Sequence, residues 1–342
     1  MARADLLKKL FLSYQRREDR EFRDAAEAIV QEERKKHHVV LANELERILR
    51  NGTAPSSVRP APQAFHPPPQ DSDRGAPLFD IRYPDRYLAE LVLTPDVRLA
   101  VERIKREFRE WDVLEANGLP PTQKVLFCGP SGCGKTATAS SVASELGLPL
   151  MYVRFDAVVS SLLGETATNL RKVFDYASRG HWVVLFDEFD AIGRSRDDAT
   201  EHGEIKRVVN TFLQIMDSFR GRSLIIAATN FEQALDPAIW RRFDEIVRFE
   251  KPQEHEIQSL LKKRLAILRH TDDDLRILVE QLSSVTFADV ERLAFDVRKA
   301  AAVRGSTRLS REDVQEAVSR YCYRQSVLHK VEKLGNPSVD KE

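Results

Sequence analysis

The sequence predicts an α/β protein, a three-layer sandwich in which a parallel sheet lies between two layers of helices. A small helical bundle precedes the sandwich and a small four-helix domain follows it. Three observations support this fold class. Short apolar runs alternate with helix-like segments between residues 124 and 250, which is typical of a parallel sheet with helical crossovers. The apolar run 125–128 leads into a glycine-rich loop. Polar residues follow three of the runs directly, at strand ends where such sheets bind ligands.

Composition limits the classes of protein that this chain could be. Its 342 residues are enough for two or three domains. The 53 basic and 53 acidic residues balance to a net charge of zero, which argues against a bulk binder of nucleic acid or acidic membranes, without excluding a local basic groove. We find no apolar run of membrane-spanning length and no secretory signal, so no membrane partner is expected. Cys128, Cys133 and Cys322 lack paired metal-ligand spacing, which favours a reducing, cytoplasmic compartment.

The glycine-rich loop fits the phosphate-binding pattern G-x-x-x-x-G-K-[ST], which is called the P-loop or Walker A motif. We expect nucleotide binding by Gly129, Pro130, Ser131, Gly132, Cys133, Gly134, Lys135, Thr136 and Ala137. Backbone N–H groups would line an anion-binding nest, Lys135 would reach the β- and γ-phosphates, and Thr136 would bind Mg²⁺. Cys133 could be an oxidisable switch or a small residue that fills the loop. The loop and its flanking strand and helix therefore predict a P-loop NTPase that binds ATP with Mg²⁺.

Carboxylates and an amide follow two later strands. Asp187 and Glu188 end the apolar run 183–186, as in a Walker B strand. Asp187 would belong to the Mg²⁺ shell, and Glu188 would be the general base for the attacking water. Asn230 ends the run 224–228 and could bond that water or the γ-phosphate, or could be an ordinary turn residue.

Two adjacent arginines, Arg241 and Arg242, follow the last of these strand-end loops. An arginine finger stabilises the charge that spreads over the γ-phosphate during transfer. The alternative is a solvated basic pair.

The chain divides into five segments: a helical module at 1–50, a Pro-rich linker at 51–85, the nucleotide-binding α/β domain at 86–250, a helical lid domain at 251–325 and a polar tail at 326–342. The first segment has helical periodicity in three stretches and could be a plain bundle or an adaptor for a substrate or partner. The linker could be a spacer or a polyproline ligand. Thr94 and Pro95 are expected to begin a helix, and Thr286 and Ser310 are expected to cap two helices of the lid.

Taken together, the motifs resemble those of an AAA ATPase. They are Gly129–Thr136, Leu185-Phe-Asp-Glu-Phe-Asp190, Arg207-Val-Val-Asn210 with Leu213 and Met216-Asp217, Ala227-Ala-Thr-Asn230, Leu235-Asp-Pro-Ala238 and Arg241-Arg-Phe-Asp244. The order and spacing of these motifs resemble those of the branch that contains katanin, spastin and the ATPase module of membrane-anchored zinc proteases. The resemblance covers roughly residues 88–320. The resemblance implies ATP hydrolysis by a hexameric ring, with ATP between subunits. It also implies that Asn230 is sensor 1 and that Arg241 and Arg242 reach a neighbour's γ-phosphate.

Three positions depart from the pattern of that family. The segment that ends in Arg241 and Arg242 lacks the longer insert that the family usually has before Arg-Phe-Asp, so either arginine could be the main finger. Leu162 and Leu163 stand where the central pore loop usually has an aromatic residue, and a ring of leucines could still grip a threaded chain by apolar contact. Phe287 replaces the usual lid glycine and could approach the nucleotide or pack inside the lid, which we favour.

The expected function is the remodelling or unfolding of protein substrates by this ring. His255 and Glu256 begin a protease-like motif, but residue 259 is serine, so the zinc motif H-E-x-x-H is absent and proteolysis would need a separate protease partner. The alternative function is a nucleotide-gated scaffold, or a nucleic-acid-associated loader whose ATP state controls assembly.

Overall fold

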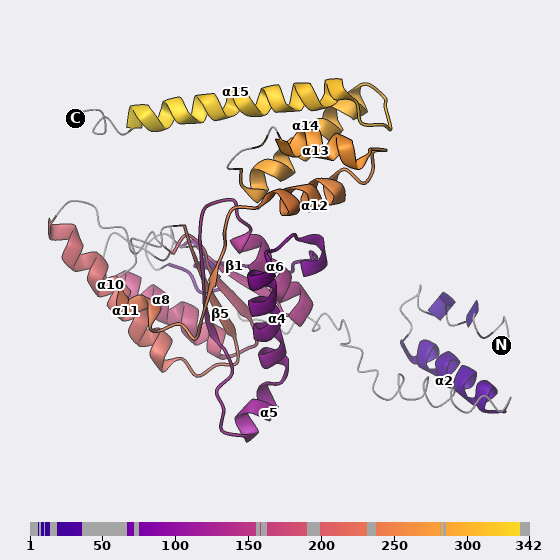
Figure 1. Cartoon of the computed structure of the whole chain (residues 1–342). Helices are drawn as coiled ribbons and strands as arrows, with labels where there is room; N and C mark the ends of the chain where they lie inside the picture. Colours follow the sequence, from indigo (N-terminus) through magenta and orange to yellow (C-terminus); the bar gives the residue numbers. More distant parts are fainter. Residues whose placement is uncertain are drawn as a thin grey trace. The chain divides into compact units, whose positions relative to one another are not determined.

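A computed structural model of the chain describes residues 6, 8–9, 11–13, 19–35, 67–71, 75–154, 158, 163–189, 199–230, 237–280, 282 and 285–335. These residues belong to two compact units, Met1–Phe65 and His66–Glu342. The helices and strands are drawn in Figure 1.

The first unit contains the helix α2 (Asp19–Lys35). Its apolar positions recur at helical spacing, and Ala25 and Val30 are buried. Residues 6, 8–9 and 11–13 are also helical. The third helix predicted for this module, at about residues 40–49, lies outside the described residues.

A six-stranded sheet is the centre of the second unit. Its strands are β1 (Phe79–Arg82), β2 (Lys124–Cys128), β3 (Leu150–Val153), β4 (Val183–Phe186), β5 (Leu224–Thr229) and β6 (Glu245–Arg248). They lie in the order β1-β3-β4-β5-β2-β6. Every neighbouring pair is parallel except β1 with β3. The predicted α/β sandwich is therefore confirmed, with one antiparallel edge strand added.

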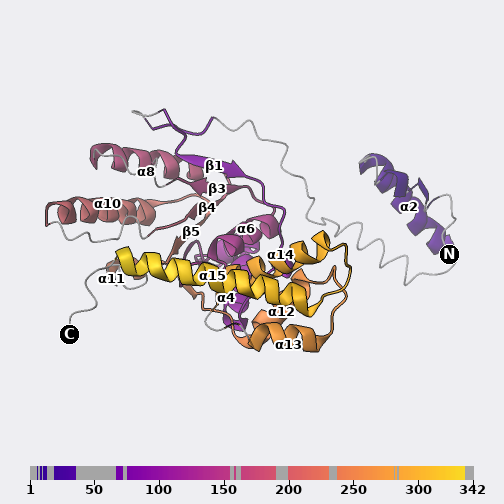
Figure 2. The ribbon, with the colours of Figure 1, turned by 90° about the horizontal axis from the view of Figure 1, so that it is seen from above.

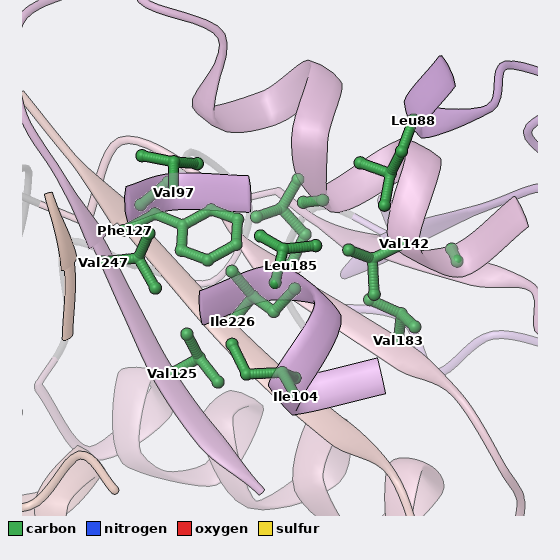
Figure 3. Close-up of a cluster of buried hydrophobic side chains, with 14 of the residues drawn as sticks. Leu88, Val97, Ile104, Val125, Phe127, Val142, Val183, Leu185, Ile226 and Val247 are labelled. Atoms are coloured by element: carbon green, nitrogen blue, oxygen red, sulfur yellow. The ribbon is translucent and has the colours of Figure 1, made fainter. Parts of the chain in front are cut away.

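Helices cover both faces of the sheet, as Figure 1 and Figure 2 show. On one face α4 (Pro95–Arg109) and α6 (Lys135–Leu146) contribute to a cluster of aliphatic side chains with Phe127 (Figure 3). On the other face α8 (Leu163–Ser178) and α10 (Ala199–Ser218) contribute phenylalanines that contact strand β4. Buried strands with two covered faces are apolar at every position, which is why the runs in the sequence were continuous.

The helix predicted at Thr94 begins there. The Thr94 hydroxyl accepts a hydrogen bond from the backbone N–H of Val97, and Pro95 occupies the first turn. Val97, Val101 and Ile104 pack into the aliphatic cluster, so the apolar face of α4 covers the sheet as expected. A second short helix, α5 (Trp111–Ala116), follows.

The prediction of a linker that extends to residue 85 is wrong in its second half. Residues 79–82 form β1, and Leu78 and Phe79 are fully buried. The turn before β1 packs on α8, where the Asn169 side chain donates to the buried carboxylate of Asp71 at 3.1 Å. The prolines around this segment favoured the prediction of a linker. The strand has only four residues, and it forms through its pairing with β3, which the local sequence does not indicate.

Four helices follow the sheet and form the domain that we call the lid: α12 (Glu254–Arg264), α13 (Asp272–Glu280), α14 (Phe287–Val303) and α15 (Arg311–Gly335). The Thr286 capping box of α14 is present, and Ser310 bonds Asp313 in the same manner at α15. The polar tail expected from residue 326 is wrong up to Gly335, because α15 continues through this stretch.

The glycine at the end of β2 permits a close backbone approach, and this gives a first prediction. Gly129 has φ 134°, and a Cβ there would lie 2.0 Å from the carbonyl oxygen of Phe249. We expect Gly129→Ala to lower the free energy of unfolding by about 3 kcal/mol or more, from backbone strain and overpacking together. Gly118→Ala is the control, since Gly118 also has positive φ but open space around it. Urea denaturation of both variants measures the difference, and equal losses would contradict the clash.

Candidate active site

A cavity of about 310 Å³ lies at the carboxyl ends of β2, β4 and β5. Its size suits a small ligand. It is lined by the loop and helix residues Ser131, Gly132, Cys133, Gly134, Lys135, Thr136 and Ala137, by the strand-end residues Asp187, Glu188 and Asn230, and by the residues Arg86, Leu91, Val92, Leu93, Leu260, Arg264, Phe287, Ala288 and Glu291. Most of the predicted site residues therefore meet in one cavity. Gly129 and Pro130 do not line the cavity, but their carbonyl oxygens accept hydrogen bonds from Lys135.

Lys135 connects the loop to the strand end at Asn230. Its ammonium donates to the carbonyl oxygens of Gly129 at 2.6 Å and Pro130 at 2.9 Å, and to Oδ1 of Asn230 at 2.7 Å. The side chain is buried. A buried ammonium requires such acceptors, or an anion, to balance the loss of water. The cation that could bind a phosphate is thus already aimed at the strand end.

The Walker B carboxylate faces the P-loop helix. The Thr136 hydroxyl donates to Oδ2 of Asp187 at 2.7 Å, and the backbone N–H of Glu188 donates to Oδ1 at 3.0 Å. Glu188 has a φ of 53°, the one positive value of a described residue that is not glycine. Such backbone strain is concentrated at functional sites. The turn is held by the N–H of Phe189, which donates to the carbonyl oxygen of Ala228 at 2.8 Å.

The phenol of Tyr152 lies next to Asp187, and the guanidinium of Arg82 lies over the Tyr152 ring. The Tyr152 hydroxyl is 3.4 Å from Oδ2 of Asp187, and Cζ of Arg82 lies 3.7 Å from the centre of the Tyr152 ring. Burial and the charge of Asp187 raise the pKa of Tyr152. The hydroxyl therefore keeps its proton and can act as a donor.

The lid touches the P-loop directly. The N–H of Ala288 donates to the carbonyl oxygen of Gly132 at 3.0 Å, and a Cβ at Gly132 would lie 2.8 Å from the Thr286 hydroxyl. Phe287 packs against the lid core and also lines the cavity. Packing inside the lid, the alternative that we favoured, is therefore present, and the approach of Phe287 to a nucleotide stays a prediction.

Three charged residues that line the cavity, Arg86, Arg264 and Glu291, were not among the site residues predicted from the sequence. Glu291 of α14 accepts hydrogen bonds from Arg86 at 2.9 Å and from Nε of Arg264 at 3.1 Å. Burial would raise the pKa of Glu291, but the hydrogen bonds and charges of Arg264 and Arg86 outweigh it and lower the pKa. No local motif marks these residues, which come from three separate parts of the chain.

Several predicted residues lie away from the cavity or outside the described part. Arg241 and Arg242 follow the short helix α11 (Pro237–Trp240), are exposed, and do not line the cavity. Arg242 forms an ion pair with Asp217 at the end of α10. Leu162 lies outside the described residues, and of Leu163 the structure describes only its place at the start of α8.

The thiol of Cys133 is buried beside the P-loop. Burial raises its pKa, against the opposing charges of Lys135 and Lys251. A raised pKa disfavours the reactive thiolate. The structure therefore favours the filling role of Cys133 over the switch.

The donor set suits a hard cation that keeps most of its own water. Thr136 and Asp187 offer oxygen atoms, which Mg²⁺ prefers, and Mg²⁺ sites commonly use only one or two protein ligands with phosphates. Among the described residues, no cluster of three or more His, Cys, Asp or Glu side chains could hold a metal ion. No helix within the described ranges is long and apolar enough to cross a membrane.

This fold and this cavity define the class of protein. A mostly parallel sheet whose strand β2 leads into a glycine-rich loop, with a lysine, a threonine and strand-end carboxylates around one cavity, is a P-loop nucleoside triphosphatase.

Comparison with known proteins identifies the family. Residues 125–251 match the model of the ATPase family associated with various cellular activities (AAA). The chain is 41% identical over 319 residues to the uncharacterized AAA family ATPase y4kL of Sinorhizobium fredii, covering 93% of this chain and 95% of that protein. The chain therefore belongs to the AAA ATPase family, and it hydrolyses ATP.

Two other relatives are similar to part of this chain. A proteasome-activating nucleotidase of Pyrococcus abyssi is 31% identical over 226 residues, which are 64% of this chain and 57% of that protein. The ATP-dependent zinc metalloprotease FtsH 3 of Symbiobacterium thermophilum is 34% identical over 211 residues, 57% of this chain and 33% of that protein. The chain thus matches little more than half of the nucleotidase and a third of the metalloprotease.

Proposed function

We propose that this ATPase assembles into a ring that unfolds or remodels protein substrates, with Mg²⁺-ATP bound between neighbouring subunits. The observation that carries the proposal is the single cavity that unites the P-loop, Asp187, Glu188 and Asn230. The relatives named as a proteasome-activating nucleotidase and a zinc metalloprotease support a protein as the substrate. A hexamer is the expected ring. We expect a cytoplasmic setting, because Cys128, Cys133 and Cys322 lack paired spacing in the sequence.

Each residue of the cavity has a role in this proposal. Lys135 and the loop N–H groups bind the phosphates, and Thr136 and Asp187 hold the Mg²⁺ shell. Bound Mg²⁺ would neutralise charge that develops on the phosphate oxygens. Glu188 accepts a proton from the attacking water, and Asn230 orients that water or the γ-phosphate.

The arginines complete the site of a neighbouring subunit. Both are exposed and lie outside the cavity of their own chain, as a group that acts on another subunit requires. Because Arg242 is paired with Asp217, we assign Arg241 as the main finger. Arg242 then fixes the segment that carries it.

The substrate is drawn past Leu162 and Leu163, while residues 1–50 recruit it or an adaptor. A separate protease could receive the unfolded chain, as the names of the two relatives suggest. These assignments rest on the resemblance of the sequence around Leu162 and Leu163 to a pore loop, on the place of Leu163 at the start of α8, and on the separate N-terminal unit.

The test is a binding assay with two labelled probes. The Glu188→Gln protein in ATP should bind a fluorescein-labelled unfolded casein, measured by anisotropy, and should release it in ADP. The same protein with Leu162→Ala and Leu163→Ala should lose casein binding. Equal binding by both proteins would refute the pore assignment. Salt-sensitive binding of a labelled DNA duplex that stimulates hydrolysis, without casein binding, would favour the nucleic-acid loader instead.

A further inference from the structure

Three strands place Arg82, Tyr152 and Asp187 on one face of the sheet. Tyr152 lies opposite Asp80 of β1 and opposite Leu185 of β4. Arg82 is two residues after Asp80 in β1, and Asp187 is two residues after Leu185, directly past the end of β4. They are therefore the diagonal neighbours of Tyr152, within reach of a long or aromatic side chain. The side chains use this arrangement, since the ring lies under Arg82 and its hydroxyl faces Asp187.

We propose that Tyr152, held in place by Arg82, is a positioning residue that fixes the Asp187 carboxylate for Mg²⁺. This inference rests on the proposed function, which assigns Asp187 to the shell of the metal. Replacement of a residue that orients a metal ligand typically weakens metal affinity by roughly 10- to 100-fold.

Hydrogen bonding at Asp187 shows why a second donor matters. Its Oδ2 faces the Thr136 hydroxyl at 2.7 Å and the Tyr152 hydroxyl at 3.4 Å, while Oδ1 accepts from the Glu188 N–H. Thr136 belongs to the P-loop helix, which contacts the nucleotide, whereas Tyr152 belongs to a strand of the sheet. The phenol thus ties the carboxylate to a rigid element that does not itself contact the nucleotide. Without it, Thr136 is the one remaining side-chain donor to Oδ2 within the described ranges.

Arg82 explains how the phenol keeps its direction. A guanidinium over an aromatic face is attracted by the negative face of the ring. The other part of the Tyr152 ring packs against the aliphatic cluster of the sheet. Packing from the core and a cation from the edge strand β1 therefore hold the ring between them. In this way β1, which is the antiparallel edge strand, contributes to the active site.

The experiment measures metal affinity apart from turnover. In the Glu188→Gln background with ATP, Mn²⁺ binding is followed by electron paramagnetic resonance of the free ion. Tyr152→Phe removes only the hydroxyl and should weaken Mn²⁺ binding roughly tenfold. Affinity for a fluorescent ATP analogue in EDTA should stay that of the parent protein. Arg82→Ala should weaken Mn²⁺ binding in the same direction, and Arg82→Lys should restore part of it.

Tyr176→Phe is the matched control, because Tyr176 is a partly buried phenol on α8 that contacts Phe79 and Trp182 instead. It should leave Mn²⁺ affinity unchanged. Parental Mn²⁺ affinity in Tyr152→Phe would overturn the inference. Equal losses of Mn²⁺ binding and of metal-free nucleotide binding would also overturn it, since they indicate a packing role. Asp187→Asn separates the two proposals: if it retains Mn²⁺ affinity, the metal site of the proposed function is itself wrong.

Discussion

Glu188→Gln should bind ATP normally and turn it over roughly 10²–10⁴-fold more slowly, which is the usual contribution of a general base. Glutamine has nearly the shape of glutamate but cannot accept the proton of the attacking water. The backbone of the turn should survive, since the N–H at position 188 still donates to Asp187 and Phe189 still bonds Ala228. Phosphate release measures turnover, and a fluorescent ATP analogue measures binding.

The control for this variant is Glu280→Gln on α13. Glu280 is an exposed glutamate, paired only with Arg276 in the part of the chain that the structure describes. Its replacement makes the same chemical change far from the cavity lining and should leave turnover unchanged. Near-normal turnover in Glu188→Gln would show that another group accepts the proton.

Replacement of both Arg241 and Arg242 by alanine should lower turnover roughly 10³–10⁵-fold, the range of arginine fingers in related phosphoryl transfers. Binding of ATP should persist, because neither arginine lines the cavity of its own subunit. Arg241→Ala alone should cost more than Arg242→Ala alone, since Arg242 is engaged with Asp217.

A mixing experiment tests whether the arginines act across subunits. The Glu188→Gln protein supplies arginines without a base, and the double arginine variant supplies a base without arginines. Mixed rings contain interfaces with both groups, so activity should return on mixing. The matched control mixes Glu188→Gln with Lys135→Ala, in which no interface is complete. No recovery in the first mixture would show that the arginines do not act in trans.

The central strands β4 and β5 were predictable to within a residue or two because each is buried on both faces. Their apolar runs, such as 183–186, need no alternation and stand out from the charged sequence around them. The P-loop could also be predicted, because its glycines and lysine lie close together in the sequence and form one recognisable pattern. Strand β1 was not, since a four-residue segment between prolines carries little local signal and its pairing partner lies about seventy residues later.

The wall of the cavity that the lid provides could not be predicted for a different reason. Arg86, Arg264 and Glu291 are separated by long stretches of sequence and meet only when the lid packs. Tyr152 looked like one more strand residue, and its approach to Asp187 depends on the register of β3 with β4. Tertiary contacts of this kind leave no periodicity or spacing to detect.

The turn that precedes β1 has a mechanical consequence. Asp71 is buried and bonded to Asn169, and the carbonyl oxygen of Gln70 accepts from Lys172, so the chain is fastened to α8 before it enters the sheet. Tension along the chain from the first 65 residues therefore loads α8 first. Because α8 begins at Leu163, the tether lies on the same helix as one of the two leucines of the proposed pore loop.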